Sequence, residues 1–307
     1  MDRKPNRVRT RPAIPTEARE HSADLLDAES WSAGRAAVAI SDKSRMARHF
    51  VAHDLFTQGK QSIDNRRQIT AARMIVNPGT TPNEVVRQVL EWVRELVKDD
   101  ARTDRQRIPT PHIVWYTPGS IVPATLYEFR IQHPDLRNAC GLYMFPGMVD
   151  PYLEMVRGAE ATRYVNQINQ CFTYAILSAY AFDMRSGTAF FFFDDEVELQ
   201  KAVALREATH KFLFLDPEKL KREGSPAYSI QQLLSTSQTV TIYTVSSERD
   251  AVITEEFEQL TKTLQAANQS QNATQKLLRL VIINNNKQIN IPKTIKIAPP
   301  GNQPLGN

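Results

Sequence analysis

The spacing of apolar and polar residues predicts helices through most of the middle of the chain. The clearest start is Thr81-Pro82-Asn83-Glu84, which offers a capping hydroxyl, a proline for the first turn and a glutamate. Apolar residues then recur at helical spacing, so we expect an amphipathic helix that ends near Lys98. An earlier helix is expected over residues 68–76, and an extended segment over His112 to Tyr116.

The region 134–216 is expected to be entirely helical. Helices are predicted over residues 136–145 and 151–158, and the run from Cys171 to Phe182 is apolar on every side, as in a buried central helix. Asp194 or Asp195 can cap a last helix that runs to about Leu215 and stops before Pro217. We therefore expect the core of the protein to be a helical bundle.

The pattern changes after Gly224. Residues 239–245 alternate like a strand, residues 254–278 resemble a polar helix, and residues 280–297 suggest a hairpin around Asn284-Asn285-Asn286. The predicted fold class is mainly α, with some β near the C-terminus. The expected parts are a flexible arm (1–43), a helical core (44–222) and a separable C-terminal extension (223–307).

Composition and charge narrow the class of protein. The 307 residues are 41% hydrophobic with a formal net charge of +4, which fits a polyanionic partner without requiring one. The first twelve residues are basic and contain no apolar core, so they do not resemble a secretory signal, and no apolar run is long enough to span a membrane. Cys140 and Cys171 are expected to be buried, reduced side chains rather than a disulfide or zinc ligands.

Motifs for catalysis are absent from the sequence. There is no phosphate-cradling glycine loop, no spaced metal-ligand pattern and no nucleophile elbow. Helix capping accounts for the acidic group Asp194-Asp195-Glu196. We therefore expect no enzymatic activity, no cofactor and no metal.

Two lone charges stand out within the predicted apolar helices. Arg137 follows Leu136 in one of them, and Asp183 ends the run from Cys171. Burying either charge alone would cost several kcal/mol. One interpretation is a buried Arg137–Asp183 salt bridge that fixes the helix geometry, and the charges alone favour it. The other interpretation adds a phosphate or base of a nucleic acid bound by the same two side chains.

An ordered set of motifs resembles the coat proteins of flexible filamentous plant viruses of the potyvirus-like family. The matching segments are Pro134-Asp135-Leu136-Arg137-Asn138, Arg163-Tyr164, Tyr180-Ala181-Phe182-Asp183, Lys201 to Arg206, and Leu213 to Asp216. The resemblance implies that Arg137 and Asp183 bind single-stranded viral RNA without base specificity, and that Thr103 stands where the family has an RNA-contacting serine. It also implies a helical homopolymer joined through the terminal arms, located in the virion and the host cytoplasm.

Three alternatives remain. One is a nucleoprotein of a segmented negative-strand RNA virus, and another is a cellular helical interaction protein whose Arg137–Asp183 pair is structural. The third is a small-molecule enzyme. The sequence departs from the coat-protein pattern by a long region after Asp216 and by the absence of the Asp-Ala-Gly triplet. A clean protein absorbance ratio after high-salt washing would favour the cellular protein.

Overall fold

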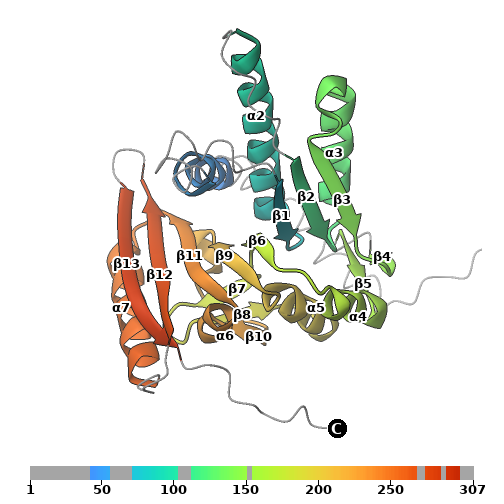
Figure 1. Ribbon diagram of the computed structural model, residues 1–307. Coiled ribbons are helices and arrows are strands. Elements are labelled where there is room, and N and C mark those ends of the chain that lie inside the picture. The colour runs from blue at the N-terminus through green and yellow to red at the C-terminus, as the bar shows by residue number, and fades with distance from the viewer. Residues whose placement is uncertain are drawn as a thin grey trace, which may run out of the picture. The chain divides into compact units, whose positions relative to one another are not determined.

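The computed structural model describes residues 42–55, 71–102, 112–150, 154–267, 274–284 and 288–297. Contacts divide the chain into Met1–Ser41 and Asp42–Asn307, and every described residue belongs to the second unit. This unit is an α/β structure in which one large sheet lies between two layers of helices (Figure 1). The expected arm as far as Ser41, and Thr103, lie outside the described residues.

The central sheet has eight strands in the order β13-β12-β11-β9-β6-β1-β2-β3. All neighbouring strands are parallel except β13, which pairs antiparallel with β12. The strands are β1 (Ala71–Val76), β2 (His112–Thr117), β3 (Cys140–Met144), β6 (Phe172–Leu177), β9 (Ala208–Phe214), β11 (Ser237–Val245), β12 (Thr274–Ile283) and β13 (Gln288–Ile297).

Each inner strand is apolar on both faces because both faces are covered by helices. In β1, Met74 and Val76 belong to one apolar core and Ile75 belongs to the other. Alternate side chains of a strand point to opposite faces, so the two cores lie on opposite sides of the sheet. This double burial explains why the strands appear as continuous apolar runs in the sequence.

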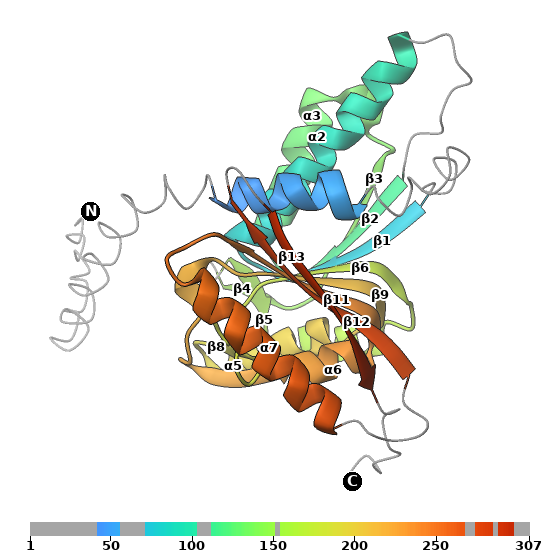
Figure 2. The same ribbon diagram turned by 90° about the vertical axis from the view of Figure 1, so that its left-hand side faces the viewer.

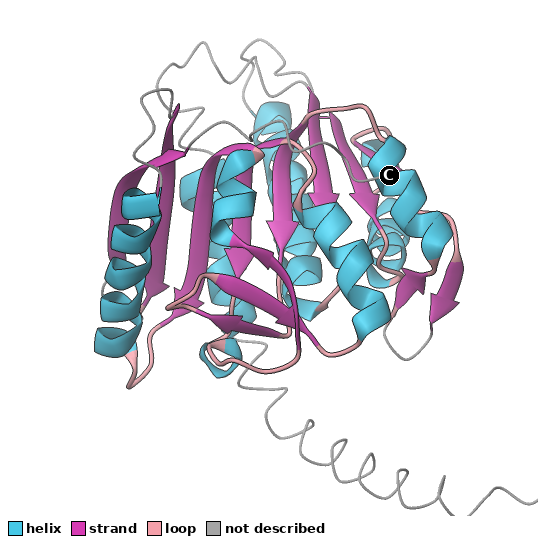
Figure 3. Cartoon of the chain, turned by 90° about the horizontal axis from the view of Figure 1, so that it is seen from below, coloured by secondary structure: helices cyan, strands magenta, loops and turns pink. Residues whose placement is uncertain are grey.

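Helices from the first half of the chain cover one face of the sheet, and helices from the second half cover the other (Figure 2). Figure 3 shows helices lying against the strands of the sheet. The first layer contains residues 42–49, η1 (Phe50–Leu55), α2 (Thr80–Arg102) and α3 (Ile121–Gln132). The second contains α4 (Ala159–Gln167), α5 (Asp194–Ala204), α6 (Ile230–Ser235) and α7 (Asp250–Ala267).

Small elements complete the second layer and the strand connections. A three-stranded antiparallel sheet contains β7 (Ala181–Asp183), β8 (Thr188–Phe191) and β10 (Ser225–Ser229), and a hairpin contains β4 (Met148–Asp150) and β5 (Met155–Arg157). Two short 3-10 helices, η3 (Pro134–Leu136) and η4 (Pro217–Lys219), follow α3 and β9.

The predicted mainly α fold is wrong. The segments expected as helices over 68–76, 136–145 and Cys171 to Phe182 contain strands β1, β3 and β6 with β7. The predicted last core helix is α5 followed by strand β9, and no side chain caps its start, since Phe193 is the N-cap residue. A short apolar run is compatible with a buried strand or a buried helix, and only the parallel sheet decides between them.

Other elements were predicted correctly. Helix α2 covers the predicted amphipathic segment, but it begins at Thr80, and the expected capping hydroxyl of Thr81 accepts no hydrogen bond. Strand β2 coincides with the expected extended segment, and β11 and the β12–β13 hairpin lie where alternation placed them. The polar helix is α7, which ends at Ala267 before β12 begins at Thr274.

The predicted separable extension is also wrong. Residues 223–307 supply β11, β12 and β13 to the same sheet as β1, and β11 pairs directly with β9 of the expected core. Removing them would leave β9 as a long exposed edge. Among the described residues, no helix is long and apolar enough to cross a membrane.

Candidate functional site at the carboxyl edge of the sheet

The chain reverses its direction of strand addition between β1 and β6. Strands β2 and β3 are added on one side of β1, and β6, β9, β11 and β12 are added on the other. In open parallel sheets, this topological switch point leaves a space beyond the carboxyl ends of the two strands, where ligands commonly bind. The candidate site is therefore sought at the ends of β1 and β6.

Asn77 follows β1 and ties the two strand ends together. Its main-chain N–H donates to the Ile176 oxygen at 2.9 Å, and its side-chain Nδ2 donates to the Ser178 oxygen at 3.0 Å. The side chain is only 1% exposed, and its Oδ1 is buried without a hydrogen-bond partner. This side chain is held firmly but keeps one acceptor unused.

The N-terminus of α2 lies directly after Asn77. Gly79 has a φ of +133°, a conformation that a residue with a side chain rarely adopts, and its carbonyl accepts the Asn83 N–H at 3.1 Å. Thr81 is buried and its Oγ1 has no partner, whereas Thr80 is exposed and accepts a 2.8 Å hydrogen bond from Lys43 Nζ. A cation thus stands at the positive end of the helix.

A second lysine approaches from the end of β9. Lys219, in η4, donates from Nζ to Ser178 Oγ at 2.9 Å, and its Nζ lies 4.0 Å from Asp216 Oδ2. The other carboxylate oxygen, Asp216 Oδ1, is buried without a hydrogen-bond partner. The Ser178 main-chain oxygen also accepts a hydrogen bond from the Tyr228 hydroxyl at 3.3 Å. Ser178, which follows β6, is therefore bonded to Asn77 after β1 and to Lys219 after β9 as well.

The surroundings raise the pKa of Asp216 and lower the pKa of Lys219. Burial raises the pKa of Asp216, although the nearby Lys219 and Lys43 partly offset that effect. Burial lowers the pKa of Lys219, Asp216 opposes this, and the positive charge of Lys43 lowers it further. Groups perturbed by burial together with specific charge partners are frequent at functional sites.

We call these residues the switch-point cluster, defined as Lys43, Asn77, Thr80, Thr81, Ser178, Asp216 and Lys219. The cluster joins two cations, one carboxyl group, hydroxyl groups and the N-terminus of a 23-residue helix. The first N–H groups of a helix have no intrahelical partner and favour an anion. The arrangement can hold an anion and can transfer protons through Asp216 or Lys219.

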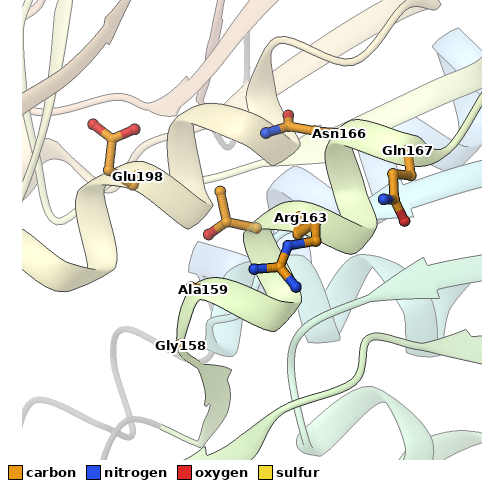
Figure 4. A pocket seen from close by; sticks show the side chains of 7 residues that line it. Gly158, Ala159, Arg163, Asn166, Gln167 and Glu198 are labelled. Atoms are coloured by element: carbon orange, nitrogen blue, oxygen red, sulfur yellow. The ribbon is translucent and has the colours of Figure 1, made fainter.

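A hollow of about 620 Å³ lies between α4 and α5 (Figure 4). Its walls carry Thr162, Arg163, Asn166 and Gln167 from α4 and Glu198 from α5. Every one of these side chains is exposed or half-buried, so the hollow offers no desolvated polar group. The switch-point cluster, which contains the buried polar atoms Asn77 Oδ1 and Asp216 Oδ1, is the stronger candidate.

The structure does not pair Arg137 with Asp183, and RNA binding by the predicted residues stays a prediction. Arg137 is an exposed residue at the end of η3, and Asp183 ends strand β7, so neither lies in an apolar helix. The Asp183 carboxylate accepts from the Arg185 N–H at 3.0 Å and from Ser186 Oγ at 2.8 Å. The predicted Arg137–Asp183 salt bridge is absent, and Thr103 lies outside the described residues.

Metal and disulfide chemistry find no support in the described residues. In that part of the chain, no group of three or more His, Cys, Asp or Glu side chains is placed to hold a metal ion. Both cysteines are free; Cys140 is buried as expected, but Cys171 is exposed.

Comparisons with known proteins give a fold-level likeness only. No family model and no curated protein matches the chain. A 6-phosphogluconolactonase from Shewanella baltica OS155 is 13% identical, with 70% of this chain and 83% of that chain covered and a TM-score of 0.32. A 6-phosphogluconolactonase from Trypanosoma brucei is 11% identical, with 71% and 89% covered and a TM-score of 0.30. Likeness this low carries no argument about residue roles.

The coat-protein resemblance is overturned by the fold. The chain is an α/β structure built around a mostly parallel eight-stranded sheet, and not the helical bundle that the resemblance implies. The packaging function is therefore wrong, and neither the nucleoprotein nor the helical interaction protein is supported. The RNA partner, the homopolymer and the virion location stay untested predictions without the resemblance that suggested them.

The sequence pattern does not reveal the switch-point cluster, because the apolar run before Asn77 is compatible with a helix as well as with a buried strand. Interpreted as a strand, the same residues form a strand–loop–helix unit, which is the usual context of an anion-binding loop. Nothing in the local sequence pointed to Ser178, Asp216 or Lys219.

Proposed function

We propose that this protein is an enzyme that binds a phosphate-bearing small molecule at the switch-point cluster. The phosphate would occupy the N-terminal end of α2, next to the exposed residues Gly79 and Thr80 and within reach of Lys43 and Lys219. Asp216 would serve as the proton-transfer group. The substrate class follows from the charge and hydrogen-bonding groups of the cluster.

The observation that carries the proposal is the approach of two lysines at one helix N-terminus. Lys43 is bonded to Thr80 at the first residue of α2, and its charge is close enough to Lys219 to lower the pKa of that amine. Within the cluster, Asp216 is the only carboxylate that opposes them, and burial favours its protonated form. A bound anion would relieve the repulsion between the lysines and use the helix dipole.

Two further features support a ligand with hydroxyl groups as well as a phosphate. Asn77 Oδ1 can accept a hydrogen bond and Thr81 Oγ1 can donate one, and both atoms are buried without partners. A buried polar group without a partner costs about 1–3 kcal/mol. Reaching these atoms requires a shift of the loop at Gly79, whose glycine permits such a change.

Ligand binding is tested by calorimetry and thermal unfolding with inorganic phosphate, sulfate and a panel of sugar phosphates. We expect at least one of these anions to raise the melting temperature of the wild-type protein. Lys43→Met and Lys219→Met should each lower the affinity by about tenfold or more, which corresponds to about 1.4 kcal/mol. Lys221→Met is the matched control, because Lys221 is exposed and pairs with Glu223 outside the cluster.

Catalysis is tested separately by turnover assays. The compound that gives the structural neighbours their name, 6-phosphogluconolactone, is a first substrate, followed by other phosphorylated lactones and sugars. Asp216→Asn should retain anion binding and lose turnover. Absence of anion binding in the wild-type protein would refute the site, and full turnover by Asp216→Asn would refute the role of Asp216.

A further inference from the structure

The two edges of the central sheet differ in how they are protected. Strand β13 carries Pro292, Lys293 and Lys296, which discourage the addition of another strand. Strand β3, at the opposite edge, has the sequence Cys-Gly-Leu-Tyr-Met and carries neither proline nor charge. Within the described residues, no strand pairs with the outer edge of β3.

The hydrogen bonds to β2 show which main-chain groups of β3 are free to pair. The Ile113 N–H donates to the Ala139 oxygen at 2.8 Å, and the Phe145 N–H donates to the Thr117 oxygen at 3.1 Å. In a parallel ladder the residues between them alternate, so the main-chain groups of Cys140, Leu142 and Met144 point to the open edge. Arg130 Nη2 donates a 2.5 Å hydrogen bond to the Cys140 oxygen. The free main-chain groups at the centre of the edge are therefore those of Leu142.

Exposed apolar side chains surround this edge. The six large ones are Tyr127 and Ile131 of α3, Tyr143 and Met144 of β3, and Met148 and Val149 of β4. Ile131 is 62% exposed and Met148 is 72% exposed, although both are apolar. Exposed apolar side chains on the elements beside an unprotected strand are typical of a protein interface. We call these six residues with the outer edge of β3 the β3 surface.

We propose that the β3 surface binds a second copy of this chain through antiparallel pairing of β3 with β3 of the partner. A two-fold axis through Leu142 would pair this residue with its own copy and Cys140 with Met144 of the other subunit. The same axis would bring the exposed sides of the two α3 helices together. The central sheet would then continue across the dimer.

The charges beside the β3 surface favour a copy of the same chain over a charged partner. They include Glu128, Arg130, Asp135 and Arg137, two of each sign, and Asp150 of β4, which is paired with Arg157, whereas the whole chain has a formal net charge of +4. In an interface with two-fold symmetry, each surface meets itself, so a single-sign surface would repel its copy. Because the β3 surface is flanked by charges of both signs, pairing it with its own copy brings no net repulsion.

Sedimentation velocity of the full chain tests the proposal. We expect the wild-type protein to have twice the mass of the chain at about 10–100 μM, as a micromolar dissociation constant requires. Ile131→Glu with Met148→Glu should make it monomeric, with a dissociation constant raised at least about 100-fold. Leu277→Glu with Ile289→Glu is the matched control at the other edge, and it should stay dimeric.

Disulfide formation tests the geometry of the pairing. In a Cys171→Ser background, Leu142→Cys should form an intersubunit disulfide, because directly opposed residues of an antiparallel pair lie about 4.5–5.5 Å apart at Cα. Tyr143→Cys should not, since its opposite residue would be Gly141. A wild-type protein that stays monomeric at all concentrations would overturn the proposal, even if its β3 edge bound a strand of another protein. A dimer that persists in the double glutamate variant would do so too.

Discussion

The side-chain amide of Asn77 donates a 3.0 Å hydrogen bond to the main-chain oxygen of Ser178, which joins the ends of β1 and β6. The two residues are 101 positions apart in the chain, yet they meet where the sheet changes its order of strand addition. The bond therefore fixes the site at which the helix N-terminus, the two lysines and Asp216 come together.

Replacing this donor with an acid should produce a pH-dependent loss of stability. Asn77→Asp keeps the shape of the side chain, but an ionised carboxylate cannot donate to the Ser178 oxygen. We expect a loss of about 1–3 kcal/mol at pH 7 by urea unfolding. Burial raises the pKa of such a carboxyl group, and protonation restores the donor, so the loss should shrink as the pH falls.

Asn138→Asp is the matched control for this variant, because Asn138 is exposed. It should change the free energy of unfolding little at pH 7 and at pH 5. Equal losses at pH 7 and pH 5 for Asn77→Asp would contradict a role for the donor.

The pH dependence of anion binding should report the charge of Lys219. Burial lowers the pKa of this amine, so its charge is lost below the ordinary lysine range, near 10.4. Sulfate affinity, measured by calorimetry, should therefore weaken as the pH rises toward that range. In Lys219→Arg the weakening should move to higher pH, because a guanidinium stays charged. Lys221→Arg should leave the wild-type profile unchanged, and an unshifted profile in Lys219→Arg would exclude Lys219 from the site.

The ion pair between Asp54 and Arg279 should stabilise the attachment of the N-terminal helical segment to the sheet. Asp54 lies in η1 and Arg279 in β12, and their side chains are 9% and 20% exposed. Asp54→Ala should cost about 3 kcal/mol in urea unfolding, because Arg279 would stay buried without its partner. The double variant Asp54→Ala with Arg279→Met should lose less unfolding free energy than the sum of the losses of the two single variants.

The exposed pair Arg94–Glu91 provides the comparison for this cycle, with side chains 29% and 45% exposed. Its coupling energy should be below about 1 kcal/mol. Additive losses for Asp54 and Arg279 would show that the buried pair does not couple the two elements.

Buried Lys211 should make the protein more stable as the pH rises above neutrality. Its Nζ donates to the Ala204 oxygen at 2.7 Å and to Thr236, and burial lowers its pKa to about 7. Between pH 7 and about 10.4, the unfolded chain holds a proton that the folded protein has released. The free energy of unfolding should therefore increase with pH by at most about 1.4 kcal/mol per unit from this group.

Lys211→Met should remove this increase, as measured by urea unfolding at pH 7 and pH 9. Lys262→Met, at an exposed position of α7, should keep the wild-type slope. If Lys211→Met and the wild-type protein had the same slope, Lys211 would not titrate in this range.

The sequence by itself determined the elements that carry local signals. Helix α2 is encoded by apolar residues at helical spacing after Pro82, and the β12–β13 hairpin by two apolar runs on either side of an asparagine-rich stretch of the sequence. Strand β11 was recognisable from its threonine and apolar alternation. In each case the deciding residues lie within a few positions of one another, so local stereochemistry is sufficient.

Only the tertiary structure decided the identity of the inner strands and the composition of the site. Strands β1, β6 and β9 are covered on both faces, so their sequences lack the alternation that distinguishes a strand from a buried helix. Lys43, Asn77, Ser178 and Lys219 come from four distant parts of the chain, and only the order of strands in the sheet brings them together. Arg137 and Asp183 suggested a pair only while both segments were taken as helices. The physical reason is that burial and proximity depend on which strands become neighbours, and the long connections between parallel strands leave that choice to the packing of the whole sheet.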